Sequence, residues 1–108
     1  MTNDRSEVRL EKKLLVNIDQ EGFESMGLTT NVSRNGISVA TTSLLPVSTQ
    51  VSLQLGVGDE TFALKGEIIW SKEDSEQGNG ETNALTGIKI DEAPDNYLKF
   101  VEKMLAGN

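Results

Sequence analysis

Apolar and polar residues alternate along most of this 108-residue chain. The alternation occurs in six short stretches, at about residues 14–18, 26–30, 37–41, 51–57, 62–70 and 84–90. Because successive side chains of a strand point to opposite faces, a period of two predicts a β-strand with one buried face at each of these places. Polar turn residues separate the stretches, so the sequence predicts short antiparallel strands.

The last part of the chain has a helical period. Five apolar residues fall on one stripe of a helix: Tyr97, Leu98, Val101, Met104 and Leu105. Pro94 is favourable at the start of a helix and Gly107 at its end, which predicts a helix over about 94–106. We expect the stripe to pack on the core, across a mouth of the strand assembly, rather than to form a groove for a partner.

The predicted elements fit a single domain, since a chain of this length holds one hydrophobic core. Six short strands and one helix must bury their apolar faces together. A small closed barrel does so and leaves no exposed sheet edge. The predicted fold is therefore mainly β: a small six-stranded antiparallel β-barrel with a C-terminal α-helix.

Some positions inside this pattern predict local features. Gly58 and Asp59 predict a hairpin turn, and Gly66 predicts a bulge or sharp bend within the fifth strand. Trp70 continues the face of Phe62, Leu64 and Ile68, which favours a place in the core over a role as a stacking surface for a base. The polar, acidic stretch 71–83 predicts a solvated surface loop, with docking of a partner as the alternative.

The charge and the residue inventory exclude several classes of function. The net charge is −7, whereas proteins that grip nucleic acid normally present a basic face, so we expect no DNA or RNA partner. Histidine and cysteine are absent, which removes the usual general base, thiol nucleophile and soft-metal ligands. We therefore expect no enzyme activity, no metal site and no cofactor. The apolar runs are too short for membrane insertion and the amino terminus has no secretory signal, so a cytoplasmic location is expected.

Arginine is confined to two short stretches. Arg5 and Arg9 are the ends of RSEVR, and Arg34 lies within NVSRNG, residues 31–36. An arginine side chain carries five donors in a planar fork that can bind a phosphate, or the O6/N7 edge of guanine, at two points. In an acidic chain this placement predicts a local site for an anionic, guanine-like ligand.

The two stretches, RxxxR followed by NxSxxG, resemble the ligand-binding motifs of PilZ domains, which are bacterial receptors for the second messenger cyclic di-GMP. Segments 66–70 and 86–90 also look like later strands of that family. The resemblance implies the same small barrel, and it implies that cyclic di-GMP is bound by Arg5, Arg9, Asn31, Ser33 and Gly36. Arg34 fills a free position of the second motif; it is an additional candidate, with a solvated side chain as the alternative.

Plainer interpretations of the second motif stay open. Asn31 and Ser33 are also typical of a turn that side chains stabilise. Gly36 suits either a turn with positive φ or a place where a ligand approaches the backbone closely.

The resemblance also predicts how a signal is relayed. Residues 1–11 are expected to form a mobile segment carrying RxxxR, ahead of a barrel and helix over 12–108. The segment has too few large apolar groups to order by itself, so bound ligand would pin it and present the change to an unknown downstream protein. Asp4 and Glu7 flank the arginines and would weaken their grip on phosphate. The alternative function is a PilZ-fold protein-interaction adaptor that does not bind nucleotide.

Overall fold

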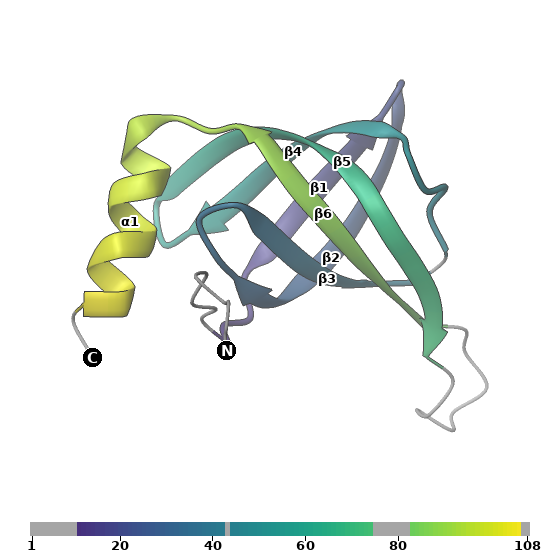
Figure 1. Ribbon diagram of the computed structural model, residues 1–108, viewed down its shortest axis with the longest axis horizontal. Coiled ribbons are helices and arrows are strands. Elements are labelled where there is room, and N and C mark those ends of the chain that lie inside the picture. The colour runs from purple at the N-terminus through teal and green to yellow at the C-terminus, as the bar shows by residue number, and fades with distance from the viewer. Residues whose placement is uncertain (1–10, 43, 75–82, 107–108) are drawn as a thin grey trace, which may run out of the picture.

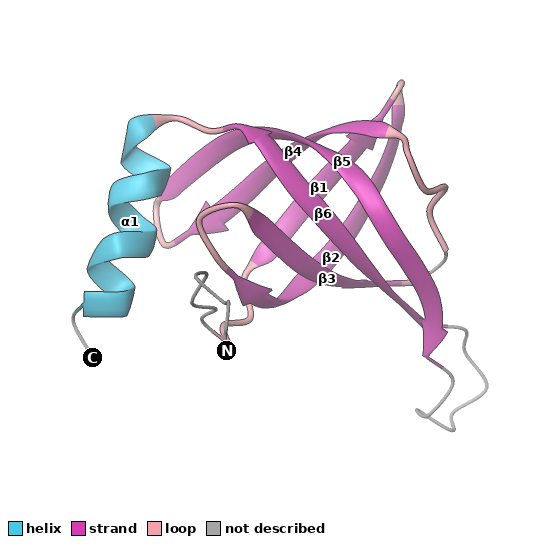
Figure 2. Cartoon of the chain, viewed as in Figure 1, coloured by secondary structure: helices cyan, strands magenta, loops and turns pink. Residues whose placement is uncertain are grey.

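Six β-strands and one α-helix make up the part of the chain that the structure describes, a computed structural model of residues 11–42, 44–74 and 83–106 (Figure 1, Figure 2). The strands are β1 (Leu15–Gln20), β2 (Phe23–Val32), β3 (Gly36–Thr41), β4 (Gln50–Val57), β5 (Glu60–Asp74) and β6 (Asn83–Glu92), and the helix is α1 (Asp95–Ala106). Each predicted strand and the predicted helix are present.

The strands form a closed barrel in the order β1-β2-β3-β6-β5-β4, and β4 pairs back onto β1. All neighbouring pairs are antiparallel. Each described strand therefore has a partner on both sides, which removes free sheet edges from this part of the molecule. The predicted six-stranded antiparallel barrel with a C-terminal helix is confirmed.

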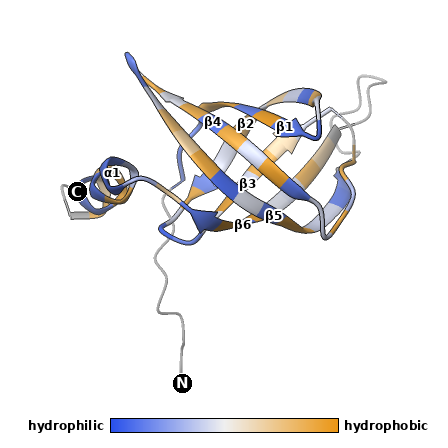
Figure 3. Ribbon diagram, turned by 90° about the horizontal axis from the view of Figure 1, so that it is seen from above, coloured by the Kyte–Doolittle hydropathy of each residue, from blue (hydrophilic) through white to orange (hydrophobic). Residues whose placement is uncertain are grey.

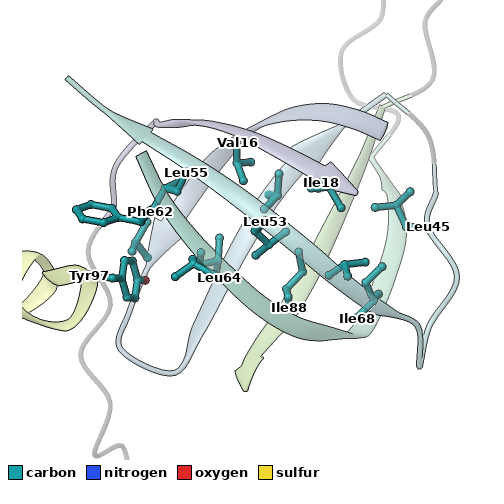
Figure 4. Packing of buried hydrophobic residues seen from close by; sticks show 14 of the residues in the cluster. Val16, Ile18, Leu45, Leu53, Leu55, Phe62, Leu64, Ile68, Ile88 and Tyr97 are labelled. Carbon is teal, nitrogen blue, oxygen red and sulfur yellow. The ribbon is translucent and has the colours of Figure 1, made fainter. Parts of the chain in front are cut away.

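Inward-facing side chains from all six strands fill the barrel (Figure 4). The largest of those that are almost completely buried are Phe62, Ile18, Leu53, Leu55, Leu64, Ile68 and Ile88. Burying a side chain of this size stabilises the fold by about 1.5–3 kcal/mol. The apolar alternation of the sequence thus corresponds to one continuous core.

Helix α1 lies at one end of the barrel (Figure 1). Tyr97 and Val101 are completely buried, and Leu98 and Leu105 are partly buried against the core. The ring of Tyr97 meets Phe62 of β5 edge to face, with the ring centroids 5.7 Å apart. The prediction that the apolar stripe of the helix packs on the core is confirmed.

Three local predictions fall at β5. The predicted hairpin turn is confirmed: Gly58 and Asp59 form it, because Val57 of β4 pairs directly with Glu60. The register does shift at Gly66, but Lys65 pairs with Glu92 and Gly66 with Ile90, so the extra residue is Asp91 and the bulge predicted within β5 lies in β6. The predicted loop over 71–83 is wrong at both ends, since β5 continues to Asp74 and β6 begins at Asn83. Strand pairing uses backbone N–H and C=O groups, so the polar side chains there do not prevent it. Residues 75–82 lie outside the described residues.

The alternation in β2 locates the strand but not its inner face. Met26 and Leu28 are 54% and 46% exposed, whereas Thr29 is completely buried. The Thr29 hydroxyl donates to the backbone carbonyl of Lys12 and accepts from the backbone N–H of Leu14 at 2.8 Å. A buried hydroxyl is tolerated when it is hydrogen-bonded in this way. Figure 3 shows the alternation of apolar and polar positions along the strands, which by itself does not say which set faces inward.

Residues 1–10, with Arg5 and Arg9, lie outside the described residues, as does Gly107. The predicted mobile segment and its boundary at residue 11 therefore stay predictions. Within residues 11–42, 44–74 and 83–106, no helix has the length and apolar character needed to cross a membrane.

Candidate functional site

A cavity of about 210 Å³ lies on the outer surface of the barrel, beside the turn that joins β2 to β3. Residues of the turn and of β2, β3, β5 and β6 line it, among them Asn31, Ser33, Gly36, Ser38, Trp70 and Lys89. All three fixed positions of NxSxxG are therefore gathered at one cavity.

A bulge in β2 directs Asn31 to this cavity. Thr29 pairs with Val39 of β3, but Asn31 pairs with Ser38, so Thr30 is an extra residue on β2. In a regular strand Asn31 would share the inward face of Thr29, because the period is two. The bulge instead places Asn31 opposite Ser38, on the outer face of the barrel.

A second bulge, in β5, directs Trp70 to the same outer face. Ile68 pairs with Ile88 and Trp70 pairs with Gly87, so Ile69 is the extra residue. Trp70 is 39% exposed, and the prediction that it lies in the core is wrong. The signal in the sequence is Ile69 itself, since an apolar residue directly after Ile68 breaks the alternation.

The two bulges put both side chains on one row that crosses four strands. Asn31 pairs with Ser38, Ser38 with Gly87, and Gly87 with Trp70. Neighbouring strands are about 4.8 Å apart, so the row spans roughly 14 Å. Its two inner positions are a serine and a glycine, whose small side chains leave the space between Asn31 and Trp70 open.

The turn between β2 and β3 is closed by its own serine. The Ser33 hydroxyl accepts from the backbone N–H of Gly36 at 3.1 Å and donates to the Gly36 carbonyl at 3.0 Å. The Ser33 backbone N–H also donates to that carbonyl, at 2.9 Å. Ser33 is buried, so in this structure its side chain shapes the turn.

Gly36 lies close to β6 and has no unusual dihedral angle. The glycines with positive φ in the described residues are Gly22 and Gly58, and Gly36 is not among them. A Cβ added at Gly36 would lie 3.3 Å from the backbone carbonyl oxygen of Ile88 on β6. The positive φ considered for Gly36 is therefore wrong, and the alternative, a close approach of the ligand to its backbone, stays a prediction.

Hydrogen bonds also tie this turn to the rest of the protein. The buried hydroxyl of Tyr97 donates to the Ser33 carbonyl at 2.7 Å. The backbone N–H of Ile90 on β6 donates to the Asn35 carbonyl at 2.9 Å. The turn is therefore anchored to both α1 and β6.

Lys89 is the one charged residue among those that line the cavity. Its ammonium lies 3.5 Å from a carboxylate oxygen of Asp91, and its side chain is 55% exposed. Arg34 does not line the cavity. It forms an ion pair with Glu102 of α1 at 3.3 Å, and both side chains are more than half exposed.

The chain enters the barrel next to this site. Lys12 and Leu14 are hydrogen-bonded to Thr29, two residues before Asn31 on β2. Arg5 and Arg9 precede these residues and lie outside the described part of the chain, so their contacts stay predictions.

A larger hollow of about 730 Å³ lies elsewhere, along β4, β5 and the end of β6. Its charged lining residues have mixed signs, Lys65 against Asp91 and Glu92, and Lys65 lies 4.0 Å from Glu92. It contains none of the motif residues. Among the described residues, no group of three or more carboxylate, histidine or cysteine side chains is placed to hold a metal ion. The smaller cavity is therefore the candidate site.

The chemistry of the candidate site suits a planar polar ligand that carries negative charge. An indole ring offers a stacking surface, the amide of Asn31 both donates and accepts, and Lys89 supplies positive charge. The described residues that line the cavity include no activated nucleophile and no paired acid and base.

The model of the PilZ domain family matches residues 3–107 of the chain. No curated protein sequence matches it closely enough to count as a relative.

Three solved structures are similar in fold. The inhibitor of motility MotI/DgrA from Bacillus subtilis is 17% identical, with a TM-score of 0.75 over 93% of this chain and 48% of its own. The PilZ domain of Escherichia coli YcgR, solved with c-di-GMP, is 9% identical, with a TM-score of 0.72 over 97% and 91%. The K. pneumonia MrkH–c-di-GMP complex is 10% identical, with a TM-score of 0.77 over 97% and 52%. The chain thus spans about half the length of MotI/DgrA and of MrkH.

Proposed function

This chain belongs to the PilZ domain family, and from that premise we propose that it is a receptor that binds cyclic di-GMP in the cavity beside the β2–β3 turn. The ligand contacts are the arginines of RxxxR and the residues of NxSxxG, together with Trp70 and Lys89. YcgR and MrkH, which share the fold, were solved with c-di-GMP. The protein acts by binding and not by catalysis.

The observation that carries this proposal is the cross-strand row from Asn31 to Trp70. Two separate bulges direct an amide of the second motif and an exposed indole to one cavity. Bulges are common beside functional sites, where they re-aim a side chain.

Each lining group has a role that fits cyclic di-GMP. A guanine stacks on the indole of Trp70, an interaction worth about 1–3 kcal/mol per base. The amide of Asn31 pairs with polar groups of the base edge or the phosphate. The ammonium of Lys89 attracts a phosphate as a point charge. Ser33 and Gly36 contribute by setting the shape of the turn.

The arginines of RxxxR complete the site from the amino-terminal side. Arg9 is three positions before Lys12, which is about 11 Å of fully extended chain. Lys12 is held beside Thr29, so the length of the chain allows Arg9 to reach the cavity. Arg5, four residues earlier, then reaches a second phosphate or guanine of the same ligand.

Titration calorimetry with cyclic di-GMP tests this proposal. We expect saturable binding by the wild-type protein, and a loss of about 1.5–3 kcal/mol in Arg9→Ala, the scale of a hydrogen bond to a charged group. Lys13→Ala is the matched control, because it removes a nearby exposed positive charge outside the motif. No heat with the wild-type protein at millimolar ligand would count against the receptor.

The relay of the signal is proposed to run through the amino-terminal segment. Bound ligand pins residues 1–11 against the barrel and so presents a new surface to a downstream protein. Hydrogen exchange with and without saturating cyclic di-GMP measures this, and we expect protection to rise in residues 1–10. Unchanged protection there, with calorimetric binding intact, would exclude this relay while leaving the receptor function in place.

One observation favours the adaptor as the second candidate. The Ser33 hydroxyl and Arg34, both in or beside the second motif, already have partners within the protein. An adaptor uses the same barrel for protein contacts and binds no nucleotide. The calorimetric result with the wild-type protein separates the two candidates.

A further inference from the structure

The hydroxyl of Tyr97 reaches the second motif from inside the barrel. It donates to the backbone carbonyl of Ser33 at 2.7 Å, across 64 positions of the sequence, and both residues are buried. We infer that Tyr97 is a positioning residue for the ligand site: its hydroxyl holds the turn of Ser33–Gly36 in the conformation that binds the ligand. The inference rests on the proposed function, because it takes this turn to be part of the cyclic di-GMP site.

The core fixes the position of the Tyr97 hydroxyl. Tyr97 has no exposed surface. Its ring packs edge to face against Phe62, with the centroids 5.7 Å apart, and at a tilt against Phe100, with the centroids 6.4 Å apart. The backbone N–H of Tyr97 donates to the carbonyl of Pro94 at the start of α1. Figure 4 shows Tyr97 at the mouth of the barrel beside Phe62. Because the packed ring fixes the position of the hydroxyl, the hydrogen bond from that hydroxyl restrains the position of the Ser33 carbonyl and of the turn.

The bonds inside the turn set its shape but not its place on the barrel. The Ser33 hydroxyl and backbone N–H both bond to Gly36, within the turn itself. The bonds from Tyr97 to the Ser33 carbonyl and from Ile90 to the Asn35 carbonyl join the turn to its surroundings. The bond from Tyr97 links the motif to α1 through a side chain in the core.

An exposed ion pair also links this turn to α1. Arg34 and Glu102 pair at 3.3 Å, with 55% and 57% of their side chains exposed. Exposed ion pairs contribute little, because water screens them and two long side chains must be ordered. A buried hydrogen bond is different, since removing the donor leaves a buried carbonyl without that partner. We therefore assign the positioning of the turn to Tyr97 and not to the ion pair.

Loss of the hydroxyl should lower affinity without removing a ligand contact. A turn that is no longer held must be ordered when the ligand binds, and that cost reduces the observed affinity. The expected rise in Kd for cyclic di-GMP is about fivefold, the equivalent of one ordinary hydrogen bond.

The test compares three variants of α1. Tyr97→Phe keeps the ring in the core and removes only the hydroxyl. Val101→Ala is the matched control, because it destabilises the same helix through a buried side chain that has no polar group. Glu102→Gln removes the charge of the ion pair. Kd is measured by calorimetry well below the melting temperature of every variant, and amide exchange over residues 33–36 is measured without ligand.

We expect Tyr97→Phe to raise Kd about fivefold and to speed exchange in the turn. Val101→Ala should lower the melting temperature and leave both quantities near wild type, and Glu102→Gln should change Kd less than twofold. The inference would be overturned if Tyr97→Phe had the same Kd and the same amide exchange in the turn as the wild-type protein. It would also be overturned if Tyr97→Phe and Val101→Ala changed Kd equally. If the wild-type protein binds no cyclic di-GMP, the proposed function fails, and the exchange comparison alone decides whether Tyr97 holds the turn.

Discussion

Trp70 occupies the space above Gly87 on the outer face of the barrel. The two residues are cross-strand partners on β5 and β6. A Cβ added at Gly87 would collide with Nε1 and Cε2 of the indole. The glycine therefore gives the ring a place to lie, and the ring forms one wall of the candidate cavity.

Replacing Gly87 by alanine should displace the ring. The added methyl group has no room beneath Trp70, and overpacking of this kind costs about 1–3 kcal/mol. We expect a lower free energy of unfolding in denaturant and a shift in tryptophan emission, which reports on this residue alone because the chain has one tryptophan.

Gly56→Ala is the control for that prediction. Gly56 also lies in a strand, but a Cβ there would be 3.7 Å from the Leu15 carbonyl oxygen, an ordinary contact. Its unfolding free energy should change by less than about 1 kcal/mol and its emission should not shift. Equal effects of the two substitutions would show that Trp70 does not lie over Gly87 in solution.

Truncating Trp70 should weaken both binding and stability. Trp70 is 39% exposed, so Trp70→Ala also removes buried apolar surface and should lower the free energy of unfolding. It should cost about 1–3 kcal/mol of cyclic di-GMP binding if the ring stacks on a guanine. Trp70→Phe keeps an aromatic face and should recover part of that loss in calorimetry. Wild-type affinity in Trp70→Ala would mean that the ring takes no part in binding.

Removing the charge of Lys89 should weaken binding in a salt-dependent way. Lys89 lines the candidate cavity, and as an exposed charge it should contribute about 1 kcal/mol, or roughly fivefold in Kd. Lys65→Gln is the matched control, since Lys65 is also exposed and paired but lines the other hollow. We expect Lys89→Gln to raise Kd at low salt and to reduce its dependence on salt concentration. The same Kd in both variants would place the ligand away from Lys89.

Truncating a buried leucine of the barrel should lower the free energy of unfolding much more than truncating an exposed one. Leu53 is 1% exposed and Leu15 is 55% exposed. Leu53→Ala should lower the free energy of unfolding by about 2–5 kcal/mol, whereas Leu15→Ala should change it by about 0.5 kcal/mol or less. Chemical denaturation of both variants measures this difference. Similar losses in both would mean that Leu15 is buried in solution.

The fold could be predicted from the sequence because its signals are local. A period of two in six stretches and a helical stripe after Pro94 each need only neighbouring residues to be recognised. The inward face of β2 could not be predicted from apolar spacing, since Met26 and Leu28 face outward and Thr29 faces inward. The partners that make Thr29 acceptable inside are Lys12 and Leu14, which are distant in the sequence.

The candidate site was predictable only where a motif marks it. The spacing of Asn31, Ser33 and Gly36 predicted that they act together, and they do line one cavity. Trp70 faces outward because Ile69 forms a bulge in β5. That bulge depends on how β5 pairs with β6, which is distant in the sequence. Tyr97 could not be found in this way, because its contact with Ser33 exists only once the helix has packed on the barrel.

The most direct test of the central claim is a fluorescence titration of the wild-type protein with cyclic di-GMP. Trp70 is the single tryptophan and lies in the candidate cavity, so a guanine that stacks on it should change its emission. We predict a saturable change whose midpoint agrees with the calorimetric Kd, and no such change with GMP at the same concentration. Calorimetric binding of cyclic di-GMP with unchanged Trp70 emission would contradict the account, because the ligand would then bind away from this cavity.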